Sequence, residues 1–285
     1  MSLAARIVAV AALALVIAPR PAPAIPGLER VQGDSLFNRD EPHKVAIAKC
    51  PPGKLVIGAG AEVLDGDRTL VRLIGVRPSR PQDPSTTGGS VTASAESANL
   101  TRAYDWSLRA YAVCATAEAL GNYFIVSVTS PYSAKAFETA SARCTNGRVV
   151  YGAGAQVSNT AGGSASGKVW LQLYRTSQPL DISRATGRAM PGFDGGWRLR
   201  SYAICAVWRD QLFADGTIAQ GAEASDRCFT AFTHGIGGGG GLTDGGPVWL
   251  DKIRPHVDLR GVDVSLTGAL DPSIGGMLAH QTCAF

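Results

Sequence analysis

The 285-residue chain has few charged residues and no block of one sign. Asp, Glu, Lys and Arg make up 18% of the chain, and the formal net charge is +4. A small, scattered charge argues against a nucleic-acid-binding surface. The six cysteines include no Cys-x-x-Cys pair, which argues against a thiolate metal cage. We therefore expect no nucleic-acid partner, no metal and no cofactor.

Long hydrophobic runs are also missing. The apolar run from Ile7 to Ala18 has 12 residues, fewer than the roughly 20 that a membrane-spanning helix needs. It follows Arg6 and precedes a Pro-rich stretch with a small-x-small pattern ending at Ala24. This arrangement is typical of a secretory signal peptide. We expect residues 1–24 to be cleaved, leaving a secreted or extracytoplasmic protein, residues 25–285, without a membrane span.

What the chain does contain is one pattern in three copies, at about residues 44–114, 138–205 and 222–283. A cysteine is followed by a Gly-rich apolar stretch, and strand-like stretches lead to a second cysteine. The closing stretches of the first two copies, Trp106–Cys114 and Trp197–Cys205, are nearly the same, and Met277–Cys283 is more divergent. A repeat of this kind predicts a repeated structural unit, and it marks shared residues as scaffold.

Six cysteines in an exported chain predict disulfides. Each copy has one cysteine at its start and one at its end, so the economical pairing is within copies. The predicted disulfides are Cys50–Cys114, Cys144–Cys205 and Cys228–Cys283.

The segments between the cysteines predict β-strands. Stretches such as Lys168–Arg175 are rich in β-branched and aromatic residues, and Gly- and Ser-rich loops separate them. About four such strands occur in each copy, giving about twelve. A sheet with one apolar face needs a partner, and three copies can bury these faces together. We expect a single all-β domain with pseudo-threefold symmetry, β-prism-like, with a β-trefoil as the alternative.

The pattern Cys-Pro-x-Gly, then Gly-x-Gly, then Trp-x-Leu-x-Ala-Tyr-Ala-x-Cys resembles repeats of uncharacterised secreted bacterial proteins. It stands here as Cys50–Gly53, Gly58–Gly60 and Trp106–Cys114. More distantly, it is similar to the β-prism of the vitelline membrane outer layer protein I type. The resemblance implies an extracellular β-protein with glycans as its ligand class. It carries over no catalytic residue.

Residues that differ between the copies are the candidates for ligand binding. Trp208 has no counterpart in the other copies and lies beside polar residues, although it could equally cover the junction between copies. The other candidates, Arg80, Phe193 and His256, lie in loops that differ between copies: Arg80–Gly89, Gly187–Gly196 and Pro255–Gly261. His280, in contrast, occupies a scaffold position that is tyrosine in the other copies.

Together with this resemblance, the lack of a catalytic motif favours a non-enzymatic binding or envelope-associated protein, and the resemblance implies an extracellular glycan or cell-envelope component as its partner. No serine stands in a Gly-x-Ser-x-Gly motif. The Gly-x-Gly-x-x-Gly at Gly235–Gly240 has no helix after it to bind a dinucleotide. One alternative is a secreted, glycosidase-like hydrolase that uses loop carboxylates, and another is a purely structural extracellular protein. The sequence does not indicate an oligomeric state or a specific ligand.

Overall fold

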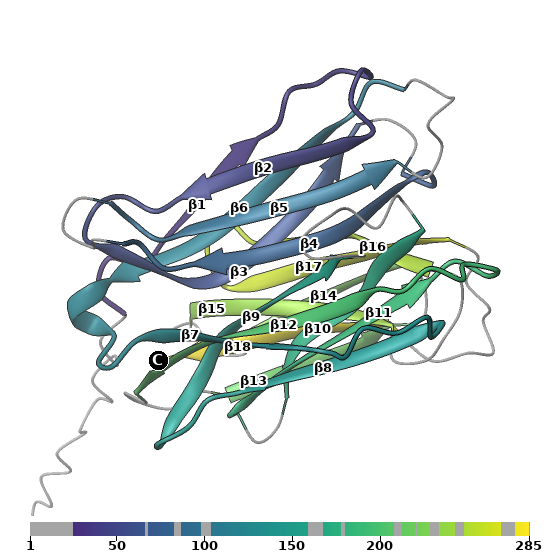
Figure 1. Cartoon of the computed structure of the whole chain (residues 1–285). Coiled ribbons are helices and arrows are strands. Elements are labelled where there is room, and N and C mark those ends of the chain that lie inside the picture. The colour runs from purple at the N-terminus through teal and green to yellow at the C-terminus, as the bar shows by residue number, and fades with distance from the viewer. Residues whose placement is uncertain are drawn as a thin grey trace, which may run out of the picture.

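The computed structural model describes residues 25–65, 68–82, 87–97, 104–158, 168–177, 180–207, 213–219, 222–228, 234–242, 248–268 and 277–284 (Figure 1). The predicted signal peptide, residues 1–24, lies outside the described residues. So does Trp208.

Nearly all of the described chain is β-strand, which confirms the predicted all-β class. A short 3₁₀ turn, Ala117–Ala119, interrupts the strands. The strands are β1 (Glu29–Asp34), β2 (His43–Lys49), β3 (Lys54–Leu64), β4 (Val71–Ser79), β5 (Ser90–Ser97), β6 (Ser107–Thr116), β7 (Phe124–Thr129), β8 (Phe137–Arg143), β9 (Arg148–Ser158), β10 (Val169–Ser177), β11 (Ile182–Ala189), β12 (Arg198–Val207), β13 (Phe213–Ala219), β14 (Glu223–Arg227), β15 (His234–Leu242), β16 (Val248–Pro255), β17 (Gly261–Gly268) and β18 (Met277–Ala284). The expected number of about twelve strands was wrong, because each copy with the strand before it contributes six.

Three of the additional strands, β2, β8 and β14, lie at sheet edges, and their buried positions hold alanines and polar residues. On β2 the buried residues include Ala46 and Ala48, whereas Val45 and Ile47 face outward and are exposed. Alanine has a weak preference for strands, since it offers little surface for packing. The pattern of these segments therefore gives a weak strand signal, although their backbones pair fully with the neighbouring strands.

The strands form three antiparallel sheets of six, and all three have the same arrangement. Sheet 1 has the order β1-β6-β3-β16-β17-β14, sheet 2 has β7-β12-β9-β4-β5-β2, and sheet 3 has β13-β18-β15-β10-β11-β8. Each sheet takes its first three strands from one copy and its last three from the preceding copy. For sheet 1 the preceding copy is the third, so the arrangement closes on itself. The sheets enclose a common core, as expected for a prism rather than a trefoil.

Within each sheet, the two copies meet along a short joint: β3 with β16, β9 with β4, and β15 with β10. Two residue pairs are in register at each joint, and β-bulges interrupt the strands close by. The bulged residues Ile57, Tyr151 and Ile236 are buried together in an apolar cluster. Bulges bend a strand and increase its twist, and here they bend β3, β9 and β15 next to the joints between copies.

The Gly-x-Gly motif lies where the backbones of the copies come closest. A Cβ atom on Gly58 would overlap the carbonyl oxygen of Ile236, in the third copy. Equivalent atoms on Gly152 and Gly237 would overlap the carbonyl oxygens of the bulged residues in the first and second copies. The three glycines thus form a closed ring of backbone contacts between the copies, with no room for a side chain.

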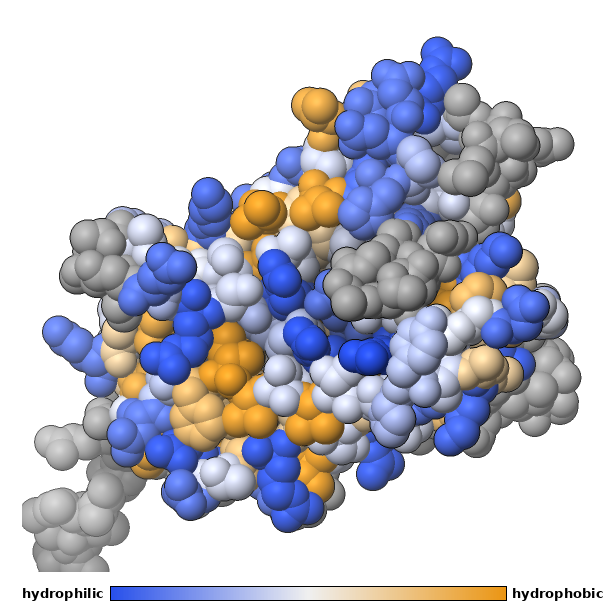
Figure 2. Space-filling view, in the orientation of Figure 1, coloured by the Kyte–Doolittle hydropathy of each residue, from blue (hydrophilic) through white to orange (hydrophobic). Residues whose placement is uncertain are grey.

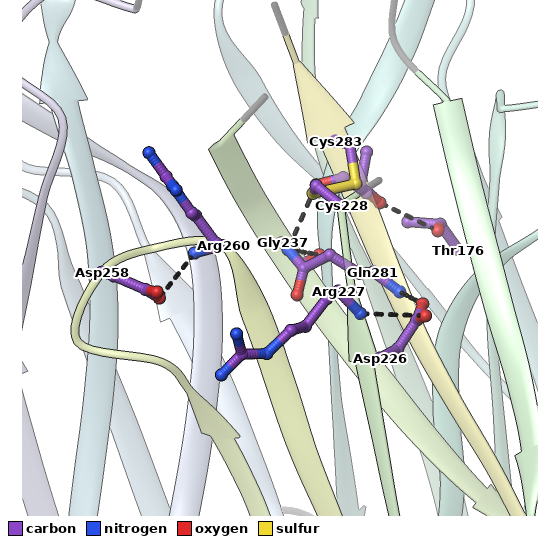
Figure 3. Close-up of a disulfide and its surroundings, with 10 residues drawn as sticks. Thr176, Asp226, Arg227, Cys228, Gly237, Asp258, Arg260, Gln281 and Cys283 are labelled. Carbon is purple, nitrogen blue, oxygen red and sulfur yellow. Dashed lines mark hydrogen bonds between the residues drawn. A yellow bond between two sulfur atoms is a disulfide. The ribbon is translucent and has the colours of Figure 1, made fainter. Parts of the chain in front are cut away.

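The three disulfides confirm the predicted pairing, and each one joins two sheets. The bond from Cys50 to Cys114 links sheet 2 to sheet 1, and the bond from Cys144 to Cys205 links sheet 3 to sheet 2. The third, from Cys228 to Cys283, links sheet 1 to sheet 3 (Figure 3). The disulfides therefore close a ring around the three sheets.

The repeated tryptophans are buried, as expected for scaffold. Trp170 and Trp249 meet edge to face, with ring centroids 5.9 Å apart. Arg72 takes the corresponding place in the first copy, and its Cζ lies 4.5 and 4.6 Å from the two ring centroids. Burial lowers the pKa of Arg72 to about 10. The two rings compensate part of the cost of desolvating the cation.

No helix in the described part of the chain is long and apolar enough to cross a membrane. Hydrophilic and apolar residues are interspersed over the face of the molecule shown in Figure 2.

The glycine ring predicts the effect of adding one methyl group. Gly58→Ala should lower the free energy of unfolding by about 3 kcal/mol, because the new Cβ must displace backbone rather than a flexible side chain. Chemical denaturation of the mature chain, residues 25–285, measures this change.

Gly53→Asn is the matched control. Gly53 has φ +79°, and a Cβ there would meet no atom within 4 Å. Asn tolerates this conformation, so the cost should stay at about 1 kcal/mol or less. Equal losses for both variants would contradict the packing role of the glycine ring.

Candidate binding groove

The outer face of sheet 1 carries an open groove of about 620 Å³. Five strands and the loop after β16 supply its walls, so residues far apart in the sequence meet there. The lining residues are Arg30, Gln32, Arg109, Tyr111, Ser225, Arg227, Arg254, His256, Val257, Asp258 and Asp263.

One cross-strand row of outward-facing residues runs through the groove. Strand register places Tyr111 on β6 opposite Gly60 on β3, and Arg254 on β16 opposite Asp263 on β17. Gly60 has no side chain, and the backbone of β16 packs against it: a Cβ there would overlap the carbonyl oxygen of Ile253. From β1 to β14 the row is Gln32, Tyr111, Gly60, Arg254, Asp263 and Ser225.

A buried carboxylate, Glu62, connects two residues of this row, Tyr111 and Arg254. It is only 4% exposed. The Tyr111 hydroxyl donates a hydrogen bond to its Oε2 at 2.7 Å, and Nη1 of Arg254 lies 3.4 Å from its Oε1. Burial, followed by the hydrogen bond to Glu62, raises the pKa of Tyr111 to about 12. The phenol therefore remains a donor at neutral pH and the carboxylate keeps its two partners.

Asp263 is the second anchored carboxylate. His256 Nε2 lies 2.8 Å from Oδ1, Ser225 donates to the same oxygen at 2.9 Å, and Arg254 donates to Oδ2 at 2.7 Å. These bonds, with the one from His256 first, hold the pKa of Asp263 well below its usual range. Ser225 and His256 share one carboxylate oxygen, so the serine lies beside the acid. A catalytic triad instead needs the serine beside the imidazole.

The arginines of the groove differ in how they are neutralised. Arg109 makes a two-pronged pair with Asp34, at 2.6 and 2.7 Å. Arg30 donates to the Pro255 carbonyl at 2.6 Å, and its guanidinium lies 5.0 Å from the centroid of the Tyr111 ring. Among the described residues, Arg30 makes no ion pair.

Arg227 also lacks an ion pair within the described part of the chain. It is exposed and extends away from the Cys228–Cys283 disulfide (Figure 3). Its backbone N–H donates to Asp226 Oδ1 at 3.0 Å, and Asp226 Oδ2 accepts from the backbone N–H of Gln281 at 3.0 Å. The disulfide and the buried Asp226 fix the strand, while the Arg227 side chain remains available to a ligand.

Of the residues predicted from sequence, His256 lies in this groove. Arg80 is exposed just beyond β4. Phe193 is partly buried against the core, and the Lys168 ammonium lies over its ring. Trp208 falls outside the described residues. Of the three unequal loops, Pro255–Gly261 contributes to the groove through His256, Val257 and Asp258.

Sequence reasoning missed the residues that strands supply, chiefly Arg30, Tyr111, Arg254 and Asp263. The repeat predicts that Tyr111 belongs to the scaffold, because Tyr202 occupies the same position in the second copy. The sequence did contain a signal. An arginine stands at the same position near the end of β4, β10 and β16: Arg77, Arg175 and Arg254. What remained hidden is that β16 pairs with β3, so the first and third copies share one face.

The same rows on the other two sheets have different chemistry. The shared arginine faces Asp263 in sheet 1, Thr92 in sheet 2 and Arg184 in sheet 3. From first to last strand the rows are Ser127, Tyr202, Gly154, Arg77, Thr92 and Ile47 in sheet 2, and Gly216, His280, Gly239, Arg175, Arg184 and Ser141 in sheet 3.

No protein-family model matches the chain, and a search of curated proteins finds no significant match. The described residues contain no group of three or more His, Cys, Asp or Glu placed to hold a metal ion.

His280, in the row of sheet 3, leads to a prediction about how the free energy of unfolding depends on pH. Burial, and then the nearby Arg175 charge, lowers the pKa of His280 to about 4, from an ordinary value of about 6.5. The folded protein keeps this imidazole neutral, whereas the unfolded chain takes up the proton first as the pH falls. His280 therefore stabilises the fold above about pH 6.5, and this contribution is lost progressively toward about pH 4.

The free energy of unfolding should fall by about 2 kcal/mol between about pH 7 and about pH 5 because of this one group. His280→Gln retains a hydrogen-bonding group near Thr176, which lies 3.1 Å from the imidazole. The variant should have a flatter pH profile in denaturant titrations. A variant profile as steep as that of the wild type would contradict the assignment.

Proposed function

We propose that the protein is a secreted, non-enzymatic binding protein that holds an acidic extracellular glycan in the groove of sheet 1. The observation that carries the proposal is the pair Arg30 and Arg227, which lie in one polar groove without ion-pair partners among the described residues. The three disulfides are compatible with an extracytoplasmic protein.

The polar lining suits a sugar chain. Gln32 and Ser225 offer amide and hydroxyl groups at opposite sides of the row, and the groove between them crosses the strands from β1 to β14. Sugar hydroxyls need such donors and acceptors, and these side chains provide both.

Two arginines of the groove favour an anionic ligand. Asp34 pairs with Arg109, and Asp263 and Glu62 both pair with Arg254. Among the described lining residues, Arg30 and Arg227 are the arginines without an ion pair, although the Asp258 carboxylate lies in the same groove. A guanidinium binds a carboxylate through two parallel hydrogen bonds, so a uronic-acid residue is the expected partner.

The carboxylates of the groove favour binding over hydrolysis. A glycosidase needs a carboxyl with a raised pKa to protonate the leaving group. Asp263 has a lowered pKa, and Glu62 is buried between Tyr111 and Arg254. Both acids serve instead as fixed acceptors that orient the neighbouring donors. A purely structural role gives no reason to keep two unpaired arginines in one groove.

Isothermal titration of mature protein with polygalacturonate oligomers tests the proposal. Arg227→Gln should weaken binding about tenfold, since a hydrogen bond to a charged group contributes about 1.5–3 kcal/mol. Arg77→Gln is the control for loss of an exposed arginine outside the groove, because Arg77 lies on the outer face of sheet 2. It should leave the affinity unchanged.

Two results would count against the proposal. One is the absence of binding across an array of acidic glycans. The other is release of new reducing ends that Asp263→Asn abolishes, which would establish the hydrolase alternative.

A further inference from the structure

A second pocket, of about 530 Å³, lies on the outer face of sheet 3. It occupies the side of the sheet formed by β8, β11 and β10, with one residue from β15. Its lining residues are Phe137, Thr139, Ser141, Leu173, Arg175, Arg184, Thr186 and Leu242.

Two arginines stand side by side in this pocket. Register pairs Arg175 on β10 directly with Arg184 on β11, and like charges opposite each other destabilise a sheet. In sheet 1 the second position of this pair is Asp263, which neutralises the arginine. Among the described residues, neither Arg175 nor Arg184 makes an ion pair. Burial and then the charge of Arg184 lower the pKa of Arg175.

Two polar groups of the same pocket also lack a partner. The Nε of Arg175 and the hydroxyl of Thr186 are buried without a hydrogen bond to the described residues. Thr186 is only 8% exposed. Buried polar groups without partners are uncommon in folded proteins and call for a specific explanation.

We propose that this pocket is an oxyanion-binding site for a sulfate or phosphate group. An anion would relieve the repulsion between Arg175 and Arg184 and bridge their guanidinium groups. It would also offer an acceptor to the Arg175 Nε and the Thr186 hydroxyl, once the arginine side chain turns toward it. The site is separate from the groove of sheet 1, and it does not depend on the proposed glycan binding.

The surroundings favour a compact anion. Leu173 and Leu242 are buried at the base of the pocket and Phe137 stands at its edge. These apolar groups limit water and strengthen charge–charge attraction. Thr139 and Ser141 are exposed on the edge strand β8, where their hydroxyls can donate to further anion oxygens.

Calorimetric titration of the mature protein with inorganic sulfate and with inorganic phosphate, at low ionic strength, tests the site. Arg184→Gln should weaken binding about tenfold or more. Arg184→Asp should abolish binding and raise the melting temperature, because it reproduces the Arg254–Asp263 pair in sheet 3. Arg77→Gln, on sheet 2, should bind as the wild type does.

A sulfated polymer distinguishes two possible sources of the anion, a free ion and an ester carried on a polymer. Dextran sulfate that binds more tightly than inorganic sulfate, and that loses this affinity in Arg184→Gln, supports a sulfate ester carried on a polymer. Binding of inorganic sulfate or phosphate without added affinity for dextran sulfate supports a free anion. Neutral dextran is the control and should not bind through this pocket.

The proposal is overturned if the wild type binds neither anion, or if Arg184→Asp binds them as the wild type does. Should Arg184→Asp fail to fold, Arg184→Gln decides, since it removes the charge without introducing a new one. Glycan binding at sheet 1 is measured independently with Arg227→Gln, so either proposal can fail without the other.

Discussion

The close approach of three backbones at Gly58, Gly152 and Gly237 is the constraint on which the rest of the structure depends. Each glycine lies against the carbonyl of a bulged residue in another copy, and the three contacts close a ring. The bulges beside them bend the strands that carry the glycines. Because the copies touch without intervening side chains, their strands can exchange partners, and each outer face combines residues from two copies.

That exchange explains how one scaffold supports three different surfaces. The central arginine is common to all three rows, but its cross-strand neighbour is Asp263, Thr92 or Arg184. The neighbour therefore neutralises the arginine in sheet 1, places a hydroxyl beside it in sheet 2, and places a second positive charge beside it in sheet 3. Differences in charge between the faces therefore depend on single outward positions, while the inward residues and the disulfides maintain the frame.

The sequence was sufficient to predict the strand class, the disulfide pairing and the prism-like grouping of three sheets. Cysteine spacing and the repeated Gly-x-Gly motif carried that information, since both reflect local constraints. It was not sufficient to locate the groove, because pairing between β3 and β16 depends on contacts across most of the chain. His256 was found because its loop differs between copies. Tyr111 and Arg254 were not, because a repeated residue can serve the scaffold and a site together.

The pairing of β3 with β16 has a consequence for the order in which the molecule is assembled. Glu62 and Arg254 are 192 positions apart, and contacts this distant form slowly because a long loop must close first. A chain synthesised from its N-terminus can complete sheet 2 from the first two copies. Sheet 1, with its groove, must wait until β17 of the third copy is present, and sheet 3 must wait for β18. The groove thus forms late in synthesis, and its presence reports that the first and third copies have come together.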